Sequence, residues 1–446
     1  MTYISNTKKQ QQEMLEAIGV KTIDDLFKVI PADFKPKSFN IPAGKSEIQV
    51  RQHLKSLASK NATDLICFLG GGFYDHYVPS AVDAIISRSE FYTAYTPYQP
   101  EVSQGVLQAI YEYQTAICRL TGMDISNASI YEGGTALYEA AMMATRITKR
   151  KKIIVCEGVS LIYRTMLRSY TSNLALKLVE ISTADGIACR EKIFKEIDSD
   201  TAAIILQNPN FFGSVDDFSD ISQKAHSAGA LTICSVYPIS LGLLKPPSEM
   251  GIDIVTGEGQ SLGLPLSFGG PYFGFLATLK THVRQMPGRV VGRTKDKQGR
   301  QGFVFTLQTR EQHIRREKAT SNICTNSTLN TIAATVYLSL LGKQGFKETA
   351  QLCADKAEYA CNKLLRIKDV KKKFSAPFFN EFVIELPMDA ADAVSALIEK
   401  GFAAGFPLGR YYKGMEHCML VSVTEKRTKE EIGHLKESLE SVLKSE

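Results

Sequence analysis

Short continuous runs of apolar residues alternate with amphipathic stretches through the middle of the chain, from about residue 61 to 330. Unbroken apolar runs are typical of strands covered on both faces. The stretches between them, such as Ile221–Ser227 before Gly229, predict helices. Strand–helix alternation implies right-handed crossovers and a mostly parallel sheet. The predicted strands are Lys152–Cys156, Leu176–Ile181, Ala203–Gln207, Ala230–Val236, Ile252–Thr256 and Phe273–Thr278.

The two ends of the chain follow different patterns. Lys8–Ile18 predicts a helix that stops at Gly19, and Thr22 caps a second helix that runs through Lys28. The C-terminal pattern predicts helix 346–367, strand 381–386, helix 390–400, strand 418–424 and helix 429–444. We therefore expect a helical extension (1–60), a large α/β domain (61–344) and a smaller C-terminal α/β domain (345–446).

Composition and charge exclude several classes of protein. The 446 residues are 44% hydrophobic and 22% charged, with a net charge of +6, which is ordinary for a globular protein. The basic runs 149–152 and 371–373 are short and indicate solvated loops, so we expect no nucleic-acid contact. No run approaches the ~20 apolar residues of a membrane span. Nine scattered cysteines without a CxxC pair or zinc spacing indicate no metal site and a reducing, cytoplasmic location.

A glycine turn precedes one predicted helix. Ser129–Leu137 reads as a short strand, a turn and a helix start. Backbone N–H groups at a helix N-terminus favour an anion, and a threonine hydroxyl adds a donor. The turn therefore indicates a phosphate cup, although a plain tight turn fits the same residues. The cup residues would be Glu132, Gly133, Gly134 and Thr135.

Residues 252–275, IDIVTGEGQSLGLPLSFGGPYFGF, are laid out like the strand and turn that carry the Schiff-base lysine of pyridoxal phosphate enzymes. Gln260 stands at the lysine position, and an amide cannot form an imine with an aldehyde. We therefore expect no catalytic residue in this chain. Lys245 and Lys280 are the nearest lysines, but Lys245 lies in a proline-rich loop and Lys280 ends a strand.

The preceding strand lacks a second group that such enzymes need. A carboxylate normally keeps the pyridine nitrogen of the cofactor protonated. Here Leu231–Cys234 runs into Ser235–Pro238 without an acid. The loss of both groups favours a degenerate cofactor site over a shifted register.

Three loops carry chemistry that suits an interface or a substrate channel. The segment 70–77 combines glycines with aromatic and imidazole groups, the segment 92–101 carries tyrosines between prolines, and the segment 309–318 is densely charged. Structural loops, or a salt-bridged surface helix at 309–318, are the alternatives. The candidate residues are His76, Tyr95, Thr96, Tyr98, Gln99, Arg310 and His313.

Several longer segments together resemble the P-protein of the glycine cleavage system, in particular subunit 1 (alpha) of its two-subunit form. LQTREQHIRREKATSNICT (307–325) is the most specific of them, and YEGGTA (131–136) alone is not specific. The resemblance covers nearly the whole chain. The other segments are YTAYTPYQPEVSQG (92–105), NPNFFG (208–213), LKPPSEMG (244–251), SFGGPYF (267–273) and MPGRVVG (286–292).

This resemblance implies a fold-type I pyridoxal-phosphate transferase-like architecture and the half of the enzyme that lacks the cofactor lysine. The family's reaction forms an imine between glycine and pyridoxal phosphate, releases carbon dioxide and passes the aminomethyl group to the lipoyl arm of H-protein. The resemblance places the cofactor on a lysine-bearing subunit 2 (beta), in an expected α2β2 assembly. This chain would complete that site and would be inactive alone.

Two other functions remain open from the sequence. The chain could be a self-sufficient pyridoxal-phosphate lyase or aminotransferase that uses Lys245 or Lys280. It could also be an assembly subunit with no part in any active site.

Overall fold

The computed structural model describes residues 5–324 and 327–444. Thr325, the last residue of the 307–325 segment, lies outside the described residues, as do the outermost residues of the two predicted end domains. The chain divides into two compact parts, residues 1–63 and 64–446. The domain boundaries expected at 60 and 344 stay predictions.

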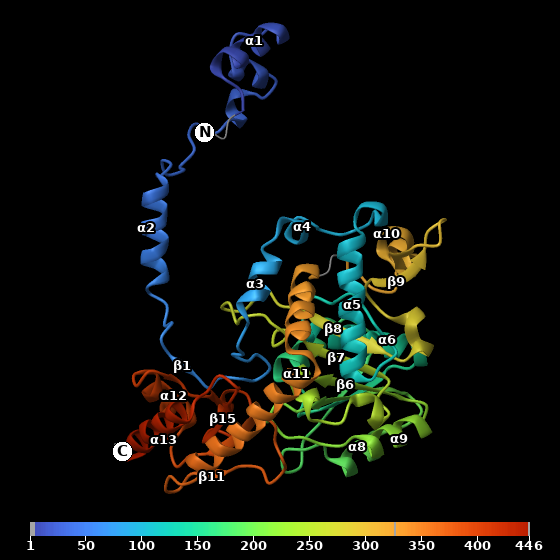
Figure 1. Cartoon of the computed structure of the whole chain (residues 1–446), viewed down its shortest axis with the longest axis vertical. Coiled ribbons are helices and arrows are strands. Elements are labelled where there is room, and N and C mark those ends of the chain that lie inside the picture. Colours follow the sequence, from blue (N-terminus) through green and yellow to red (C-terminus); the bar gives the residue numbers. More distant parts are fainter. Residues whose placement is uncertain (1–4, 325–326, 445–446) are drawn as a thin grey trace. The chain divides into compact units, whose positions relative to one another are not determined.

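The first part consists of short helices with locally encoded ends. It contains α1 (Lys8–Ile18), η1 (Ile23–Phe27), η2 (Ala32–Phe34) and α2 (Glu47–Ala58), labelled in part in Figure 1. Capping boxes at Thr7, Thr22 and Ser46 satisfy the first backbone N–H groups of three of these helices. None of the described residues up to Thr63 is buried, so local capping rather than a core defines these helices.

A seven-stranded sheet forms the centre of the second part (Figure 1). Its order is β2-β8-β7-β6-β5-β3-β4; β3 to β7 are parallel, whereas β8 runs antiparallel to β7 and β2 antiparallel to β8. This confirms the mostly parallel α/β sheet that the apolar runs predicted. The strands are β2 (Ile125–Ser126), β3 (Lys152–Cys156), β4 (Lys177–Ile181), β5 (Thr201–Asn208), β6 (Leu231–Val236), β7 (Ile254–Glu258) and β8 (Gly274–Thr278).

Helix α6 packs across the central strands of this sheet. It contacts β5, β6, β7 and β8 through a buried face of small and apolar residues that includes Leu137, Ala140 and Ala144. The α6 helix therefore fixes the Gly133 turn beside the carboxyl ends of the parallel strands, where ligands bind in such folds. The other helices of this region are α3 (Ser80–Ile86), α4 (Ser89–Tyr92), α5 (Gln104–Thr121), α6 (Gly133–Thr148), α7 (Leu161–Thr171), α8 (Arg190–Glu196) and α9 (Ser219–Ser227).

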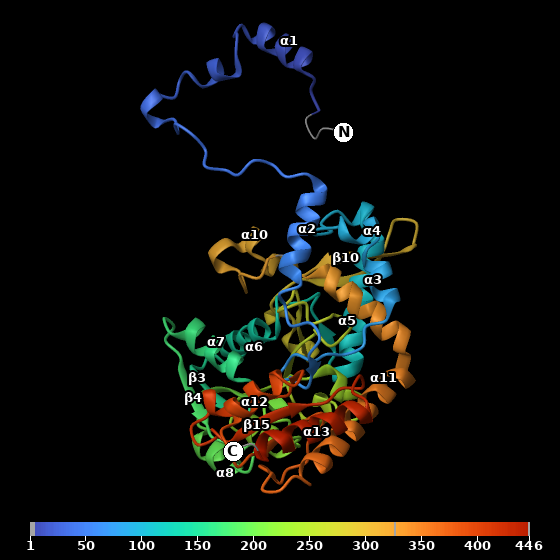
Figure 2. The ribbon, with the colours of Figure 1, turned by 90° about the vertical axis from the view of Figure 1, so that its left-hand side faces the viewer.

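A four-stranded antiparallel sheet follows, in the order β11-β12-β15-β14. In Figure 2 these C-terminal elements are orange and red and lie together. The long helix α11 leads into them and is kinked at Gly342, which has φ 57° and ψ −172°. The elements are α11 (Thr328–Leu364), β11 (Lys371–Lys372), β12 (Glu381–Glu385), α12 (Ala390–Ile398), β13 (Phe402–Ala403), β14 (Phe406–Pro407), η9 (Leu408–Arg410), β15 (Cys418–Ser422) and α13 (Lys429–Lys444).

Several elements were not predicted from the sequence. β9 and β10 form an antiparallel hairpin, and β1 pairs with β13 in parallel. The segment 309–318 is divided among short turns, so the alternative of one salt-bridged helix is wrong. No helix in the described part of the chain is long and apolar enough to cross a membrane. The remaining elements are β1 (Ile66–Cys67), η3 (Pro100–Val102), η4 (Pro238–Gly242), η5 (Pro247–Met250), η6 (Lys280–Gln285), β9 (Val290–Lys295), β10 (Gln301–Thr306), η7 (Gln308–Arg310), α10 (Gln312–Arg315) and η8 (Arg316–Lys318).

Candidate functional site

Gln260 lies at the turn that follows β7, and its side chain is buried and fully engaged. Its amide nitrogen donates to the carbonyl oxygens of Tyr74 (3.0 Å) and Leu264 (2.8 Å), while its amide oxygen accepts from the backbone N–H of Tyr74 (2.9 Å). The two bonds to Tyr74 tie the turn to a loop 186 residues away in the sequence, and the bond to Leu264 closes the turn itself. At the position where a cofactor lysine would stand, the Gln260 side chain therefore has a structural role: it holds backbone segments together.

The glycine turn at the start of α6 faces two carboxylates of the same chain. Glu258, the last residue of β7, accepts from the backbone N–H of Gly133 (2.9 Å) and of Gln260 (3.2 Å). Glu132 is the N-cap of α6 and accepts from the N–H of Thr135 (2.7 Å) and from its hydroxyl. Whether these residues bind a phosphate stays a prediction, and two of their N–H donors are taken by carboxylates.

Close packing explains why glycine occupies both turn positions. A Cβ on Gly133 would lie 2.3 Å from the hydroxyl of Tyr163, and one on Gly134 would lie 2.3 Å from the sulfur of Met166. Both contacts come from helix α7. The two glycines thus allow α7 to pack closely against the start of α6. This packing explains the glycines as a plain tight turn, without a bound ligand.

Tyrosine side chains fill the space between this turn and the neighbouring strands. Tyr74, Tyr163 and Tyr237 line a residual cavity of about 20 Å³, together with Ser235 and Glu258. That volume suits roughly one water molecule. Ser235 is the next-to-last residue of β6, where pyridoxal phosphate enzymes of this layout carry the acid for the ring nitrogen.

These residues do not fit a pyridoxal phosphate group. The lysine and the acid are replaced by Gln260 and Ser235, and a carboxylate stands at the helix start where a phosphate would bind. The cavity is far below the ~300 Å³ at the lower end of small-molecule sites. We derive no chemical step through the cofactor at this position.

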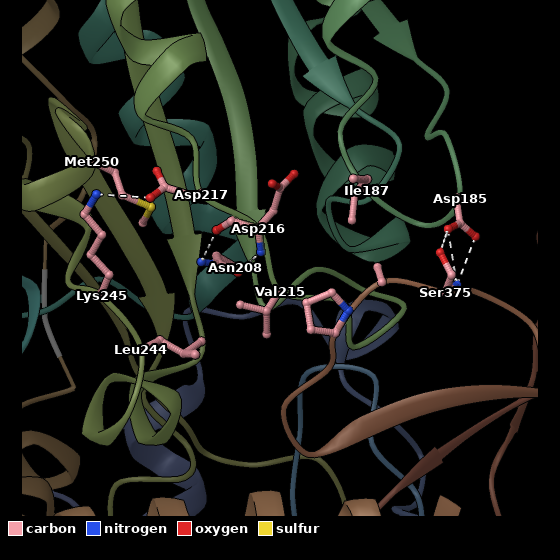
Figure 3. Close-up of a pocket in the computed structure, with 12 residues that line it drawn as sticks. Asp185, Ile187, Asn208, Val215, Asp216, Asp217, Leu244, Lys245, Met250 and Ser375 are labelled. Atoms are coloured by element: carbon pink, nitrogen blue, oxygen red, sulfur yellow. Dashed lines mark hydrogen bonds and ion pairs between the residues drawn. The ribbon is translucent and has the colours of Figure 1, made fainter.

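Neither alternative lysine lies at this site. Lys245 lines a separate cavity of about 450 Å³, where its Nζ lies 3.1 Å from a carboxylate oxygen of Asp217 (Figure 3). Asp185 and Asp216 also line that cavity, so its carboxylates oppose a phosphate. Lys280 is exposed at the start of η6.

His76 belongs to a buried hydrogen-bond network. Its side chain is 1% exposed, its Nδ1 lies 2.6 Å from Oε2 of Glu425, and its Nε2 pairs with the hydroxyl of Tyr237. Ligand atoms of His76, Cys353 and Glu425 lie within 4.8 Å of one another. Two ligands of a tetrahedral zinc ion would lie roughly 3.3 Å apart. The 2.6 Å separation is that of a hydrogen bond, so this cluster is a structural link.

Tyr98 and His313 lie together at a second, open cavity of about 200 Å³, which Arg289 and Glu311 also line. Arg289 is 3% exposed; its Nη2 donates to the Tyr98 hydroxyl (2.5 Å), and its guanidinium carbon lies 4.9 Å from the centre of the Tyr98 ring. Tyr98 itself is 50% exposed. The cavity therefore joins a buried cation to an accessible aromatic surface. We call it the Tyr98 pocket.

Two polar atoms in the wall of the Tyr98 pocket are incompletely satisfied. Nε of Arg289 lies 3.3 Å from Oε2 of Glu311, close enough for an ion pair but without the alignment of a hydrogen bond. Neither this Nε nor Oε1 of Glu311 has a hydrogen-bond partner among the described residues. Buried groups of this kind are uncommon in native structures and require an explanation.

Arg310 does not line the Tyr98 pocket but bonds the backbone that carries the lining residues. Its guanidinium donates to the backbone carbonyls of Met286, Gly288 (3.0 Å) and Leu307 (3.1 Å). It thereby fixes the backbone just before Arg289. Among the other candidates, Tyr95 and Gln99 are exposed and Thr96 is half-buried on the same loop as Tyr98, whereas His76 belongs to the separate network.

The residues that fill the site at the Gln260 turn were not identified from the sequence. The charged residues of the Tyr98 pocket were not identified from it either. Glu258 was given no role in the sequence analysis, where the predicted strand ends at Thr256. Tyr163 gave no signal, because its role depends on where α7 packs. Arg289 and Glu311 stand inside the segments 286–292 and 307–325, and only the fold brings these two segments together.

The fold and the closed site define a chain of the pyridoxal-phosphate-dependent fold-type I class that lacks the cofactor lysine. Glutamate decarboxylase of Lactobacillus brevis CGMCC 1306 has the same fold, with a TM-score of 0.68 over 92% of this chain and 95% of that one at 11% identity. A crystal structure of glycine decarboxylase (P-protein) of the glycine cleavage system, in inhibitor-bound form, matches with a TM-score of 0.94 and 44% identity, over 99% of this chain and 100% of that one.

Sequence comparison gives the family. Residues 1–439 match the family model of the glycine cleavage system P-protein. The probable glycine dehydrogenase (decarboxylating) subunit 1 of Geotalea uraniireducens (strain Rf4) is 56% identical over 443 residues, which are 99% of this chain and 100% of that protein. The chain therefore belongs to the glycine cleavage system P-protein family, as a subunit of the glycine dehydrogenase (decarboxylating). The family, fold class and enzyme class predicted from the sequence are confirmed.

Proposed function

We propose that this chain is the lysine-lacking half of a two-subunit glycine decarboxylase, and that it completes a pyridoxal phosphate site held by its partner. The partner is a lysine-bearing subunit 2 (beta), in an α2β2 assembly. Together they decarboxylate glycine and transfer the aminomethyl group to the lipoyl arm of H-protein. The assembly works in the cytoplasm, which agrees with nine scattered cysteines that form no CxxC pair.

The observation that carries this proposal is the bonding of Gln260. An enzyme that holds pyridoxal phosphate covalently needs a free lysine amine at this turn. Here an amide makes three buried hydrogen bonds, beside a cavity of about 20 Å³. The family's chemistry requires the cofactor, so the lysine must come from another chain.

The Tyr98 pocket is the part of this chain that we assign to the shared site or to the lipoyl channel. It is open, and it presents a buried guanidinium beside a half-exposed tyrosine and His313. Tyr and Arg are enriched at protein interfaces because they combine contact area with directional hydrogen bonds. Tyr95, Thr96 and Gln99 extend the same loop, and Arg310 holds the backbone beneath it.

A self-sufficient enzyme is disfavoured by the surroundings of the two nearest lysines. Lys245 is paired with Asp217 in a cavity lined by further carboxylates, and Lys280 is exposed. An assembly subunit without a catalytic contribution remains the main competitor. If the chain has only this assembly role, substitutions in the Tyr98 pocket leave the activity of the assembled enzyme unchanged.

The direct test uses this chain and its partner, purified separately and then mixed, with pyridoxal phosphate and lipoylated H-protein. Exchange of the glycine carboxyl group with labelled bicarbonate measures the activity, and visible absorbance shows which chain holds the cofactor. We expect exchange only in the mixture, with the cofactor band in the partner. Exchange and a cofactor band from this chain alone would disprove the proposal.

A further inference from the structure

Positive charge is concentrated in one stretch of this chain, residues 286–318, which contains the β9–β10 hairpin and the turns after it. The stretch holds nine Lys and Arg residues against three Asp and Glu residues. Its net charge is therefore the +6 of the whole chain, and the other residues hold as many acidic as basic side chains. The positive charge of the protein thus belongs to this one region.

Most of these cations are exposed and lack an acidic partner. Of the nine, only Arg289 and Arg300 form ion pairs in the part of the chain that the structure describes, with Glu311 and Asp296. Exposed cations contribute little to the stability of the chain, so their grouping needs another reason. The exposed cations without an ion pair among the described residues are Arg293, Lys295, Lys297, Arg315, Arg316 and Lys318.

The hairpin places two of these cations on the face that adjoins the Tyr98 pocket. Side chains alternate between the two faces of a strand, so Arg293 and Lys295 share the face of Val291. Val291 pairs across the hairpin with Phe305, whose ring centre lies 6.3 Å from that of Tyr98. Lys295 therefore lies on the face of the Tyr98 pocket, about 13 Å along the strand from Val291.

The turns after the hairpin bring three further cations to the same pocket. Arg289, just before β9, and His313, in α10, line one cavity of about 200 Å³, so the two segments meet there (Figure 1). Arg315 ends α10 two residues after His313, and its Nε donates to the carbonyl oxygen of Thr309 (3.2 Å). The helix η8 follows directly with its two exposed cations. Cations of both segments therefore surround an open cavity.

We propose that these six cations, which we call the basic rim of the Tyr98 pocket, bind an acidic face of the lipoyl-bearing protein. This inference rests on the proposed function, in which the lipoyl arm of H-protein reaches the shared site. A lipoyl arm reaches a pocket only while the protein that carries it is bound beside the entrance. Unpaired cations there attract a surface rich in carboxylates and accelerate its association. The face of H-protein around its lipoyl-lysine is therefore rich in Asp and Glu.

Charge reversal on the hairpin tests this docking surface without changing a residue that lines the pocket. In Arg293→Glu with Lys295→Glu, two exposed cations become anions. Lys195→Glu with Lys224→Glu makes the same change on α8 and α9, which lie far from α10 in Figure 1, and is the matched control. Each variant is assembled with the partner subunit. Glycine–bicarbonate exchange is then measured with lipoylated H-protein and, separately, with lipoamide, which is uncharged and has no protein surface.

We expect R293E/K295E to raise the KM for H-protein about tenfold, because the rim then repels an acidic face. The rate with H-protein should fall relative to the rate with lipoamide, whereas K195E/K224E keeps the wild-type ratio. The wild-type KM for H-protein should rise with ionic strength, since salt screens the attraction. R293E/K295E should lose most of this salt dependence.

Three results would overturn the inference. One is a KM for H-protein that changes neither with salt nor in R293E/K295E, and another is an equal loss of rate with H-protein and with lipoamide. The third is a folded R293E/K295E chain that no longer binds the partner subunit, because the rim then belongs to the subunit interface. Should R293E/K295E not fold, R293Q/K295Q removes the charge alone, and the same comparisons apply to it.

The proposed function fails by a different observation. A wild-type complex that catalyses no exchange with either acceptor would refute the glycine decarboxylase assignment. Calorimetric binding of lipoylated H-protein to that complex, at low and at high salt, then decides the docking inference. Binding that weakens with salt and with R293E/K295E supports the basic rim, and binding that is indifferent to both refutes it.

Discussion

Two polar clusters of this chain differ in how completely their amide and charged groups are paired, although the buried hydroxyl of Ser261 at the Gln260 turn also lacks a partner among the described residues. At the Gln260 turn, the amide and the neighbouring carboxylate of Glu258 are bonded within the chain, and the cavity holds about 20 Å³. At the Tyr98 pocket, a cavity of about 200 Å³ adjoins two buried polar atoms that lack hydrogen-bond partners among the described residues. The difference separates a site that has become part of the fold from one that still has capacity for a ligand or partner.

The largest effect should come from pH, acting on the closed site. Burial raises the pKa of Glu258 from 4.5 to about 8, against the lowering effect of the N–H groups of Gly133 and Gln260. The folded chain therefore binds this proton more tightly than the unfolded chain. Its contribution to stability is complete below about pH 4.5 and is lost as the pH rises through about 8, at roughly 1.4 kcal/mol per pKa unit.

Chemical denaturation across this pH range tests the assignment. Glu258→Gln should flatten the fall in unfolding free energy, because the titrating group is gone. Glu381, whose pKa burial raises to about 7, and Glu139, whose pKa burial also raises, act with the same sign and contribute to the remaining slope. An unchanged slope in E258Q would show that Glu258 does not titrate as a buried acid.

The next largest effect is expected for Gln260→Leu. The substitution keeps the volume but leaves the N–H of Tyr74 and the C=O of Leu264 without their partners, whereas the C=O of Tyr74 keeps the N–H of His76 as a donor. Unsatisfied buried groups cost about 1–3 kcal/mol each, so we expect a loss of roughly 3 kcal/mol by urea denaturation. The exposed Gln351→Leu is the control. A loss as small as in that control would mean that the turn is not held by Gln260.

At the open site, Arg289→Leu should affect activity more than folding. It removes the guanidinium that bonds and stacks on Tyr98, and we expect about a tenfold loss of exchange activity in the assembled enzyme, equivalent to ~1.4 kcal/mol. Arg300→Ala, in the exposed turn between β9 and β10, is the control. Full activity of the assembled R289L enzyme would favour a subunit that contributes only to assembly. If R289L no longer binds the partner subunit, Arg289 belongs to the subunit interface.

The smallest effect is expected for Tyr98→Phe. The ring remains beside Arg289, and only the hydroxyl that accepts from Nη2 at 2.5 Å is lost. A single such bond contributes about 1 kcal/mol, so activity in the complex should fall severalfold while unfolding changes little. A loss larger than in R289L would indicate that the hydroxyl contacts the ligand directly.

The sequence predicted the sheet well, because the buried parallel strands are continuous apolar runs. Lys152–Cys156 was predicted to the residue, and the other strands shifted by one or two residues at their ends. The first half of α11 was not predicted: the sequence predicted a helix over 346–367, whereas α11 spans Thr328–Leu364 with a kink at Gly342. The hairpin β9–β10 lacks such a long run, because VVGRTK in β9 becomes polar after two valines and QGFVFT in β10 has only three consecutive apolar residues.

The sequence predicted the site only through the residues that it lacks, namely the cofactor lysine and the acid for the ring nitrogen. Gln260 in place of lysine is visible in a linear sequence, as is the missing acid at Ser235. The groups that replace them come from distant segments: Tyr74 and Tyr163 meet Glu258 only after folding. Arg289 and Glu311 likewise become neighbours through the turn that Arg310 fixes.

A covalently attached hydrogen-bond acceptor at the start of α6 has a consequence for how this chain persists before it meets any ligand. A dissociable group stabilises a protein only as far as its free concentration exceeds its dissociation constant. Glu258 is present once in every copy, so its effective concentration at Gly133 does not vary with metabolite supply. The melting temperature of the newly made chain should accordingly be insensitive to dilution, dialysis and shortage of cofactor.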